Sequence, residues 1–257
     1  ILAGDHCQLP PTIKCIEAAR GGLGRTLLEK VVLHKPETVS LLKIQYRMHE
    51  DIMRFPSRWF YHDELEAAPE VKYRGILDFD TPVSWIDTSE LDLQEKAVAE
   101  GTGRLNTGDV VLVKDSSDST YWYGEAELLV RELKNYMERI GIRRILEEHI
   151  DFGVISPYRA QVHYLRHLLK KEPFFRPCRR LITVHTVDGF QGQERDVIMI
   201  SLVRANEKGQ IGFLRDLRRM NVAITRARMK LLILGEAVTL TRHPFYRELY
   251  EYIGGLR

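Results

Sequence analysis

The sequence predicts an α/β protein in which helices cover both faces of a parallel sheet. Short and nearly all-apolar runs alternate along the chain with amphipathic helical patterns. Parallel strands have this apolar composition because the crossover helices shield both faces of the sheet from water. The chain has 257 residues, of which 44% are apolar, and this is enough to form a large core.

The first half of the chain predicts few regular elements. Residues 1–5 have the pattern of the end of a buried strand, and the two prolines that follow cannot continue a strand. The other elements that we expect are a helix around 27–32, a short strand at 41–44 and a helical stretch from Met48 to Phe60. Pro56 is expected to divide that stretch into two short helices.

The second half alternates more regularly. Residues 88–122 are polar and acidic, with one strand-like run at 110–113, and we predict that they form an insertion at the surface. Beyond them we expect helices around 129–140, 162–169, 214–225 and 244–253, and strands at 152–156, 181–184, 197–203 and 231–234. Gly141 is expected to end the first of these helices, and Pro244 to begin the last.

Composition excludes several classes of protein. The longest strongly apolar stretch is 197–203, far shorter than the ~20 residues of a membrane helix, and no signal segment opens the chain. The three cysteines are odd in number and form no CxxC pair, so we expect neither a disulfide framework nor a metal site. We therefore expect a reduced environment, the cytoplasm or a eukaryotic nucleus, with no membrane partner.

The net charge of +2 conceals an uneven distribution. Residues 152–257 carry 19 Lys and Arg against 9 Asp and Glu, whereas residues 86–151 carry 8 against 15. Clustered cations attract polyanions and displace their counterions. A solvated basic face is the alternative, and composition leaves both interpretations open.

Polar motifs interrupt the apolar pattern at the segments that connect strands and helices. In chain order they are GDHCQLPP from Gly4, QYRMH from Gln45, SPYRAQV from Ser156, VDGFQGQE from Val187 and NVAITRAR from Asn221. Ligands of parallel α/β sheets bind beyond the carboxyl ends of the strands, and we expect the chemistry of this chain to lie there.

These motifs, in this order, resemble the second half of a superfamily 1 helicase motor of the 5′→3′ branch, which includes the nonsense-mediated-decay helicase. The resemblance implies a RecA-like fold. Residues 1–22 would then be the exit segment of the first RecA-like domain, and residues 23–257 the second domain, with its insertion around 88–122. Residues 19–26, ARGGLGRT, mimic a phosphate-binding loop but lack its first glycine and its lysine.

The resemblance implies that Arg47 and Arg226 contact the phosphates of ATP as arginine fingers, from one solvent-open rim. Arginine suits this role because it stays charged and can bind two oxygens at once. Isolated arginines are more often ordinary surface charges. The other residues that match the family's nucleotide site are Gln8 as a γ-phosphate sensor, Glu194 on the ribose, Gly192 for close approach and Tyr46 against the nucleoside.

Two segments are the candidates for contacting single-stranded nucleic acid, whether DNA or RNA. They comprise Ser156, Pro157, Tyr158 and Arg159, and then Thr183, His185 and Thr186. Hydroxyl groups and the amides at a loop-to-helix junction bind phosphates without reading the base sequence. Tyr158 or His185 could stack on a base. Burial of Tyr158 in the core is an equal alternative.

The sequence contains no GxxxxGK[ST] motif. The resemblance therefore implies that the upstream RecA-like domain holds most of the ATP and Mg²⁺ contacts, and that this chain alone does not hydrolyse ATP. That upstream domain and single-stranded nucleic acid are the expected partners. The alternatives are a non-catalytic nucleic-acid-binding module and a protein scaffold built on residues 86–151.

Overall fold

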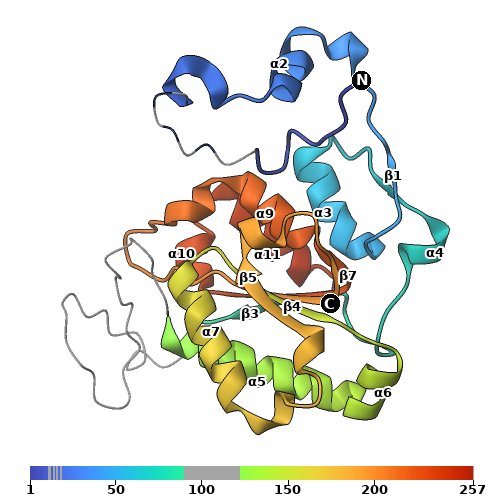
Figure 1. Ribbon diagram of the computed structural model, residues 1–257, viewed down its shortest axis with the longest axis vertical. Helices are drawn as coiled ribbons and strands as arrows, with labels where there is room; N and C mark the ends of the chain where they lie inside the picture. The colour runs from blue at the N-terminus through green and yellow to red at the C-terminus, as the bar shows by residue number, and fades with distance from the viewer. Residues whose placement is uncertain (11–12, 14, 16, 18, 90–121, 257) are drawn as a thin grey trace.

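The computed structural model describes residues 1–10, 13, 15, 17, 19–89 and 122–256 (Figure 1). A five-stranded parallel sheet lies at its centre, with the strand order β3-β7-β6-β4-β5. The strands are β3 (Val83–Asp87), β4 (Phe152–Ser156), β5 (Ile182–Thr186), β6 (Arg195–Ser201) and β7 (Ala227–Gly235). The predicted α/β fold with a parallel sheet is therefore confirmed.

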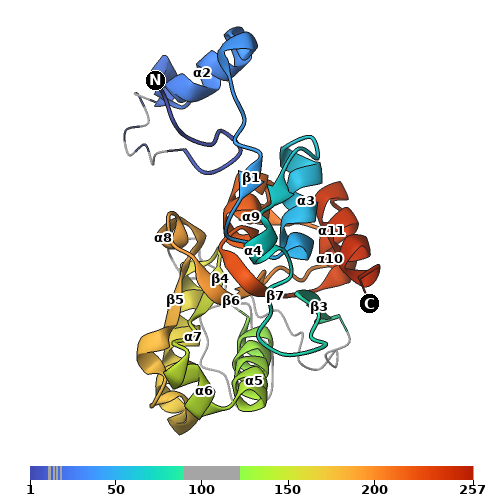
Figure 2. The same ribbon diagram turned by 90° about the vertical axis from the view of Figure 1, so that its right-hand side faces the viewer.

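Helices cover both faces of this sheet (Figures 1 and 2). One face packs against α5 (Tyr123–Ile140), α6 (Ile142–Glu147) and α7 (Arg159–Lys171), and the other against α3 (Glu50–Phe60), α9 (Leu217–Ile224) and α11 (Pro244–Gly254). In β6, Val197 and Met199 belong to the first core, whereas Ile198 and Ile200 belong to the second. Successive side chains of a strand point to opposite faces, which explains why this strand is apolar throughout.

Short elements complete the framework. The helical ones are η1 (Ala19–Leu23), α2 (Leu27–His34), η2 (Pro36–Thr38), α4 (Pro69–Lys72), η4 (Pro173–Phe175), η5 (Arg179–Leu181), α8 (Val187–Phe190), η6 (Gly212–Arg215) and α10 (Ala237–Leu240). A separate parallel pair joins β1 (Ile44–Gln45) to β2 (Glu66–Ala67). None of the helices in the described residues is long and apolar enough to span a membrane.

Two predicted strands of the first half are wrong or too long. Residues 1–5 pair with no strand of the described chain, and Ile1 and Leu2 are exposed. Residues 41–44 contribute only Ile44 to β1, while Leu41 and Leu42 are exposed. An apolar run indicates burial only where a neighbouring strand or helix covers it, and neither segment joins the central sheet.

The predicted break at Pro56 is also wrong, because α3 is one helix from Glu50 to Phe60. The buried side chains Ile52, Met53 and Phe55 anchor this helix in the core. Their packing offsets the ~3 kcal/mol that an interior proline costs a helix. His49 caps the amino end, because its Nδ1 accepts a hydrogen bond from the Asp51 amide at 3.0 Å.

The second half agrees more closely with the predictions. Strand 152–156 has the predicted bounds, and α5 ends before Gly141, whose φ of 88° favours glycine. The other strands and helices shift by a few residues, and β3 was not predicted. Most of the predicted insertion at 88–122, including the run 110–113, lies outside the described residues.

Hydrogen bonds hold residues 5–9 against α9 and the end of α3. Asn221, which is fully buried, donates from Nδ2 to Cys7 O at 2.9 Å and to the Tyr61 hydroxyl at 2.8 Å. The same hydroxyl donates to Asp5 Oδ2 at 2.6 Å. Leu9 is buried in the core on the α3 side of the sheet. One asparagine therefore joins the N-terminal segment to the body of the domain.

Replacing this asparagine should loosen the N-terminal segment. Asn221→Ala removes two hydrogen bonds from a buried site, which should cost about 1–3 kcal/mol of unfolding free energy. Urea unfolding measures that loss, and limited proteolysis should show faster cleavage before residue 25. Asn135→Ala, at an exposed position of α5, is the control. Equal losses in both variants would contradict the role of Asn221.

A buried polar network closes the carboxyl edge of the sheet. Glu125 is fully buried, and its Oε1 accepts hydrogen bonds from Ser201 Oγ at 2.5 Å and from the Val203 amide at 2.9 Å. Gln161 donates to Ser201 Oγ at 2.9 Å and accepts from the Trp122 amide at 2.8 Å. Val203 has a φ of 68°, which β-branched residues rarely adopt. The network therefore holds a strained turn in place after β6.

Burial raises the pKa of Glu125 to about 8, and its hydrogen bonds with Ser201 and Val203 only partly oppose that effect. Between pH 4.5 and 8 the folded state keeps the proton that the unfolded chain releases. The free energy of unfolding should therefore fall as the pH rises through this range, by at most about 1.4 kcal/mol per pH unit.

Glu125→Gln removes the titrating group while keeping an acceptor for Val203. Its unfolding free energy, relative to wild type, should therefore be higher at pH 7.5 than at pH 5. Urea unfolding at both pH values measures the difference. Glu138→Gln, at an exposed position of the same helix, should lack this pH dependence. A Glu125→Gln difference that does not vary with pH would contradict the assignment.

Candidate functional site

The sequence motifs gather at two opposite edges of the parallel sheet. Arg195 begins β6 and Ala227 begins β7, and these residues pair at the amino edge. Ser156 and Thr186 end β4 and β5, and they pair at the carboxyl edge. The expectation that all of the chemistry lies beyond the carboxyl ends is therefore wrong, because the motifs that lead into β6 and β7 lie at the amino edge.

Arg47 lies in the loop between β1 and α3, at the amino edge. Its Nε is 2.5 Å from Glu194 Oε2, and its Nη1 donates to Thr225 O at 3.0 Å. Gln45 fixes the loop, because its Oε1 accepts hydrogen bonds from the amides of Arg47 and Met48 at 2.9 and 2.7 Å. The Arg47 side chain is 34% exposed, so its guanidinium remains accessible at the surface.

Arg226 meets Arg47 at the same place but is buried. Its Nη2 donates to Thr225 Oγ1 at 3.1 Å and to Gln8 Oε1 at 3.0 Å, while Nε and Nη1 donate to the carbonyls of Val222 and Gln193. Burial, followed by the charge of Arg47, lowers the pKa of Arg226 to about 10. The side chain therefore stays charged at neutral pH.

The predicted convergence of the two arginines is thus present in the structure. The predicted solvent-open rim holds only for Arg47, because Arg226 is 3% exposed. Arg226 is enclosed by acceptor oxygens, which belong to Val222, Thr225, Gln193 and Gln8.

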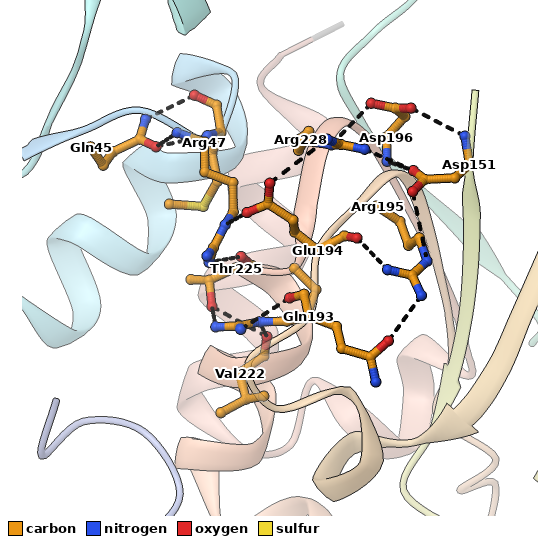
Figure 3. Close-up of polar contacts among 12 residues, drawn as sticks. Gln45, Arg47, Asp151, Gln193, Glu194, Arg195, Asp196, Val222, Thr225 and Arg228 are labelled. Atoms are coloured by element: carbon orange, nitrogen blue, oxygen red, sulfur yellow. Dashed lines mark hydrogen bonds and ion pairs between the residues drawn. The ribbon is translucent and has the colours of Figure 1, made fainter. Parts of the chain in front are cut away.

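Acidic side chains lie between the arginines of this edge (Figure 3). Glu194 lies between Arg47 and Arg228, and its Oε1 is 3.7 Å from Arg228 Nη1. Arg228 also contacts Asp151 and Asp196, each at 3.0 Å. Burial is the main cause that raises the pKa of Asp196. These contacts join the starts of β6 and β7 to the residue before β4.

The edge has an excess of positive charge. Among the described residues its acidic members are Asp5, Glu194, Asp151 and Asp196, and its arginines are Arg47, Arg74, Arg195, Arg226 and Arg228. The positive charges of Arg47 and Arg226 come together at Thr225. Glu194 forms an ion pair with Arg47 there. This donor set fits a polyanion such as a nucleoside triphosphate, whose phosphate oxygens accept from guanidinium groups.

The remaining candidates for the nucleotide site lie around the two arginines. Gln8 accepts from Arg226 and donates to Asp5 Oδ2 at 2.8 Å, and it borders a cavity of about 360 Å³ together with Gln191. Gly192 has a φ of 80°, a conformation that favours glycine. Tyr46 is 64% exposed. The structure thus leaves the Tyr46 ring accessible and places Gln8 in contact with an arginine.

The candidates at the carboxyl edge divide into buried and accessible residues. Ser156 is fully buried and Tyr158 is 3% exposed. The Tyr158 ring packs 5.8 Å from that of Phe213, and burial raises its pKa. The predicted stacking of Tyr158 on a base is therefore wrong for this arrangement, and its alternative, a core aromatic, describes the structure.

Arg159 is exposed at the start of α7, and Pro157, His185 and Thr186 are half-buried. Thr183 is also half-buried but lies near the amino end of β5, where its hydroxyl accepts a hydrogen bond from Arg195 Nη2 at 3.1 Å. The Nδ1 of His185 accepts from the Thr186 amide at 2.9 Å. Its ring fills the space above Gly189, where an added Cβ would lie 1.7 Å from Nδ1. His185 therefore has a defined position beside the accessible residues.

Several residues that fix the position of the candidate site residues through hydrogen bonds or ion pairs were not predicted from the sequence. They are Gln45, which fixes the Arg47 loop, Asn221, which holds residues 5–9, and Arg228, which links three acidic groups. Gln191 belongs with them, because its Nε2 donates to Leu9 O at 2.9 Å. All four lie inside the quoted motifs, so their position in a motif was the available signal.

Residues 23–238 match a family model described as an AAA domain. The chain is 36% identical over 253 residues to an uncharacterized ATP-dependent helicase of Methanocaldococcus jannaschii, covering 98% of this chain and 34% of that protein. It is 36% identical to DNA polymerase alpha-associated DNA helicase A of Saccharomyces cerevisiae, with 94% and 35% coverage. DNA-binding protein SMUBP-2 of Rattus norvegicus is 35% identical, with 98% and 24% coverage.

The chain spans about a third or less of these relatives. The matched region contains the segments from QYRMH through NVAITRAR, so the resemblance drawn from those motifs is confirmed. The chain belongs to the AAA domain family that forms the C-terminal part of superfamily 1 helicases.

Proposed function

We propose that this chain is the C-terminal motor domain of an ATP-dependent helicase or translocase, and that Arg47 and Arg226 are its arginine fingers. The observation that carries the proposal is the convergence of the two guanidinium groups on Thr225, at 3.0 and 3.1 Å. Like charges held this close repel each other, and among the described residues Glu194 is the acid that pairs with Arg47, whereas none lies within 4.0 Å of Arg226.

The chemistry of phosphoryl transfer explains this arrangement. Charge spreads over the phosphate oxygens in the transition state, and fixed cations stabilise it. Arg226 is held by acceptors on four residues, so its position is defined before any phosphate contacts it. Gln8 contacts Arg226 directly and has both a donor and an acceptor, which suits a sensor of the terminal phosphate. Glu194 orients Arg47, in addition to the ribose contact that we assign to it.

The phosphate loop and the magnesium ligands are assigned to another domain. The sequence contains no GxxxxGK[ST] motif, and the relatives extend well beyond the matched region. ATP and Mg²⁺ would therefore be held mainly by an upstream RecA-like domain, with residues 1–22 as its exit segment and the second domain beginning at residue 23. Exposed Leu23, Leu27 and Leu33 supply an apolar surface suited to that contact.

Single-stranded nucleic acid is the proposed partner of the carboxyl edge. Arg159, His185 and Thr186 combine a cation, a ring and a hydroxyl group beside the amino end of α7, where free amides favour phosphates. Thr183 lies near the other end of β5, so we do not assign it a strand contact at this edge. The names of two relatives refer to DNA helicase or DNA-binding activity, which supports a nucleic-acid partner here. Both DNA and RNA fit contacts of this kind.

Removing either finger should abolish ATP hydrolysis by the full-length protein. Arg47→Ala and Arg226→Ala should each lower the turnover number by about 10³–10⁵, since an arginine finger contributes this much to the rate. Steady-state hydrolysis with saturating single-stranded nucleic acid measures the effect. Affinity for the strand should change little, because the fingers lie at the opposite edge of the sheet.

The matched control is Arg143→Ala, on the exposed face of α6, where Arg143 pairs with Glu147 at 2.8 Å. It should hydrolyse ATP at the wild-type rate. Loss of strand binding in parallel with hydrolysis in the finger variants would contradict the assigned role. Full hydrolysis by Arg226→Ala would contradict its role as an arginine finger. Absence of ATP hydrolysis by the wild-type full-length protein, with strand binding retained, would favour the alternative of a non-catalytic nucleic-acid-binding module.

The 257-residue chain on its own should show no ATPase activity above background. It has the finger arginines but no phosphate loop to hold the triphosphate. Phosphate release from the purified chain, with and without single strands, measures this. Strand-stimulated turnover would overturn the division of the site between two domains.

A further inference from the structure

We infer that a basic groove beside the edge strand β5 binds the phosphates of nucleic acid that extends beyond the carboxyl-edge contacts. The inference rests on the proposed function, because it extends the path of the same strand. The groove has a volume of about 260 Å³ and is lined by residues of α7 and β5. These two elements lie side by side in Figure 2. Arg166, Lys170 and Arg179 line the groove, and Leu169, Phe175 and Val184 form its apolar floor.

The charge of this flank is uncompensated. The segment 159–182 has seven Lys and Arg and one acidic residue, Glu172. All seven cations are exposed, and Glu172 pairs instead with Lys134 at 3.6 Å. Within the described part of the chain, no acidic oxygen lies within 4.0 Å of any of the seven. A solvated helix face more often carries mixed charge, so this flank is suited to a polyanion.

Two of the guanidinium groups are held in position by carbonyl oxygens. Arg166 donates from Nε and Nη2 to Val184 O, at 3.0 and 2.6 Å. Arg179 donates from Nη2 to Lys170 O at 3.2 Å. These contacts orient the side chains without neutralising them, because a carbonyl carries no net charge. The entropic cost of ordering the Arg166 and Arg179 side chains when a ligand binds is therefore reduced.

The geometry favours nucleic acid over an acidic peptide. A peptide that extended the sheet would need the outward carbonyls of the edge strand, and Arg166 already occupies that of Val184. The position also favours a continuing strand, because α7 starts with Arg159, a candidate strand contact, and runs toward the groove. Its 13 residues span about 20 Å, the length of about six stacked nucleotides.

The test uses the 257-residue chain and fluorescent single-stranded DNA of about 6 and about 20 nucleotides, titrated at several salt concentrations. The variant Arg166→Gln/Lys170→Gln/Arg179→Gln should bind the long oligomer about tenfold more weakly. Its salt slope should be smaller by about 2, since each lost phosphate contact contributes about 0.7. Affinity for the short oligomer should not change.

Arg54→Gln/Arg131→Gln/Arg143→Gln is the matched control, because it removes the same charge at exposed positions elsewhere. It should leave the difference between the two oligomers intact. The charge-retaining variant Arg166→Lys/Arg179→Lys should keep most of the long-oligomer affinity, which separates loss of charge from loss of fold. Thermal unfolding of each variant provides a second check on the fold.

The proposed role of the groove would be overturned if the groove variant bound the long oligomer with wild-type affinity, or if the control lost as much affinity as the groove variant. The proposed function would stand in either case. A wild-type chain that binds neither oligomer would overturn both. A poly-glutamate peptide that binds the wild type as tightly as the long oligomer, and loses affinity in the groove variant, would reassign the groove to an acidic protein partner.

Discussion

The site depends on holding two guanidinium groups together at Thr225 despite their repulsion. Arg226 is buried among carbonyl, hydroxyl and amide acceptors, and none of the carboxylates in the described residues lies within 4.0 Å of it. Glu194 offsets Arg47 and also reaches Arg228, which places one negative charge among three arginines. A buried cation is tolerated only when its donors are satisfied, and the start of β7 and the end of α9 are arranged to do so.

The two edges that carry the candidate site residues are joined by one short stretch of chain. Residues 187–194 run from the carboxyl end of β5, through α8, to the amino end of β6. His185 at one end packs on Gly189, and Glu194 at the other end pairs with Arg47. Phe190 lies between them in the core, where it contacts the backbone position of Gly153. Residues 187–194 therefore connect the two edges both through the backbone and through side chains packed in the core.

The carboxyl edge depends on a different kind of interaction. Glu125, Gln161 and Ser201 form a buried network that holds the turn at Val203. Tyr158 packs beside that turn, close enough to Gly212 that an added Cβ would lie 3.1 Å from the Tyr158 hydroxyl. Because the interior of this edge is fully occupied, the accessible groups are those on its rim, from Arg159 along α7 to the basic groove.

The sequence by itself determined the parallel sheet, the bounds of β4 and the set of motifs, because apolar periodicity and unusual polar residues are local signals. It failed where burial depends on distant segments. Residues 1–5 pair with no strand among the described residues, Pro56 is tolerated by core packing, and Tyr158 is enclosed by Trp122, Val203 and Phe213, all 36 or more positions away. Only the tertiary structure placed the arginine cluster at the amino edge and the candidate strand-binding residues Arg159, His185 and Thr186 at the other. That separation follows from sheet order and crossover direction, which no single segment encodes.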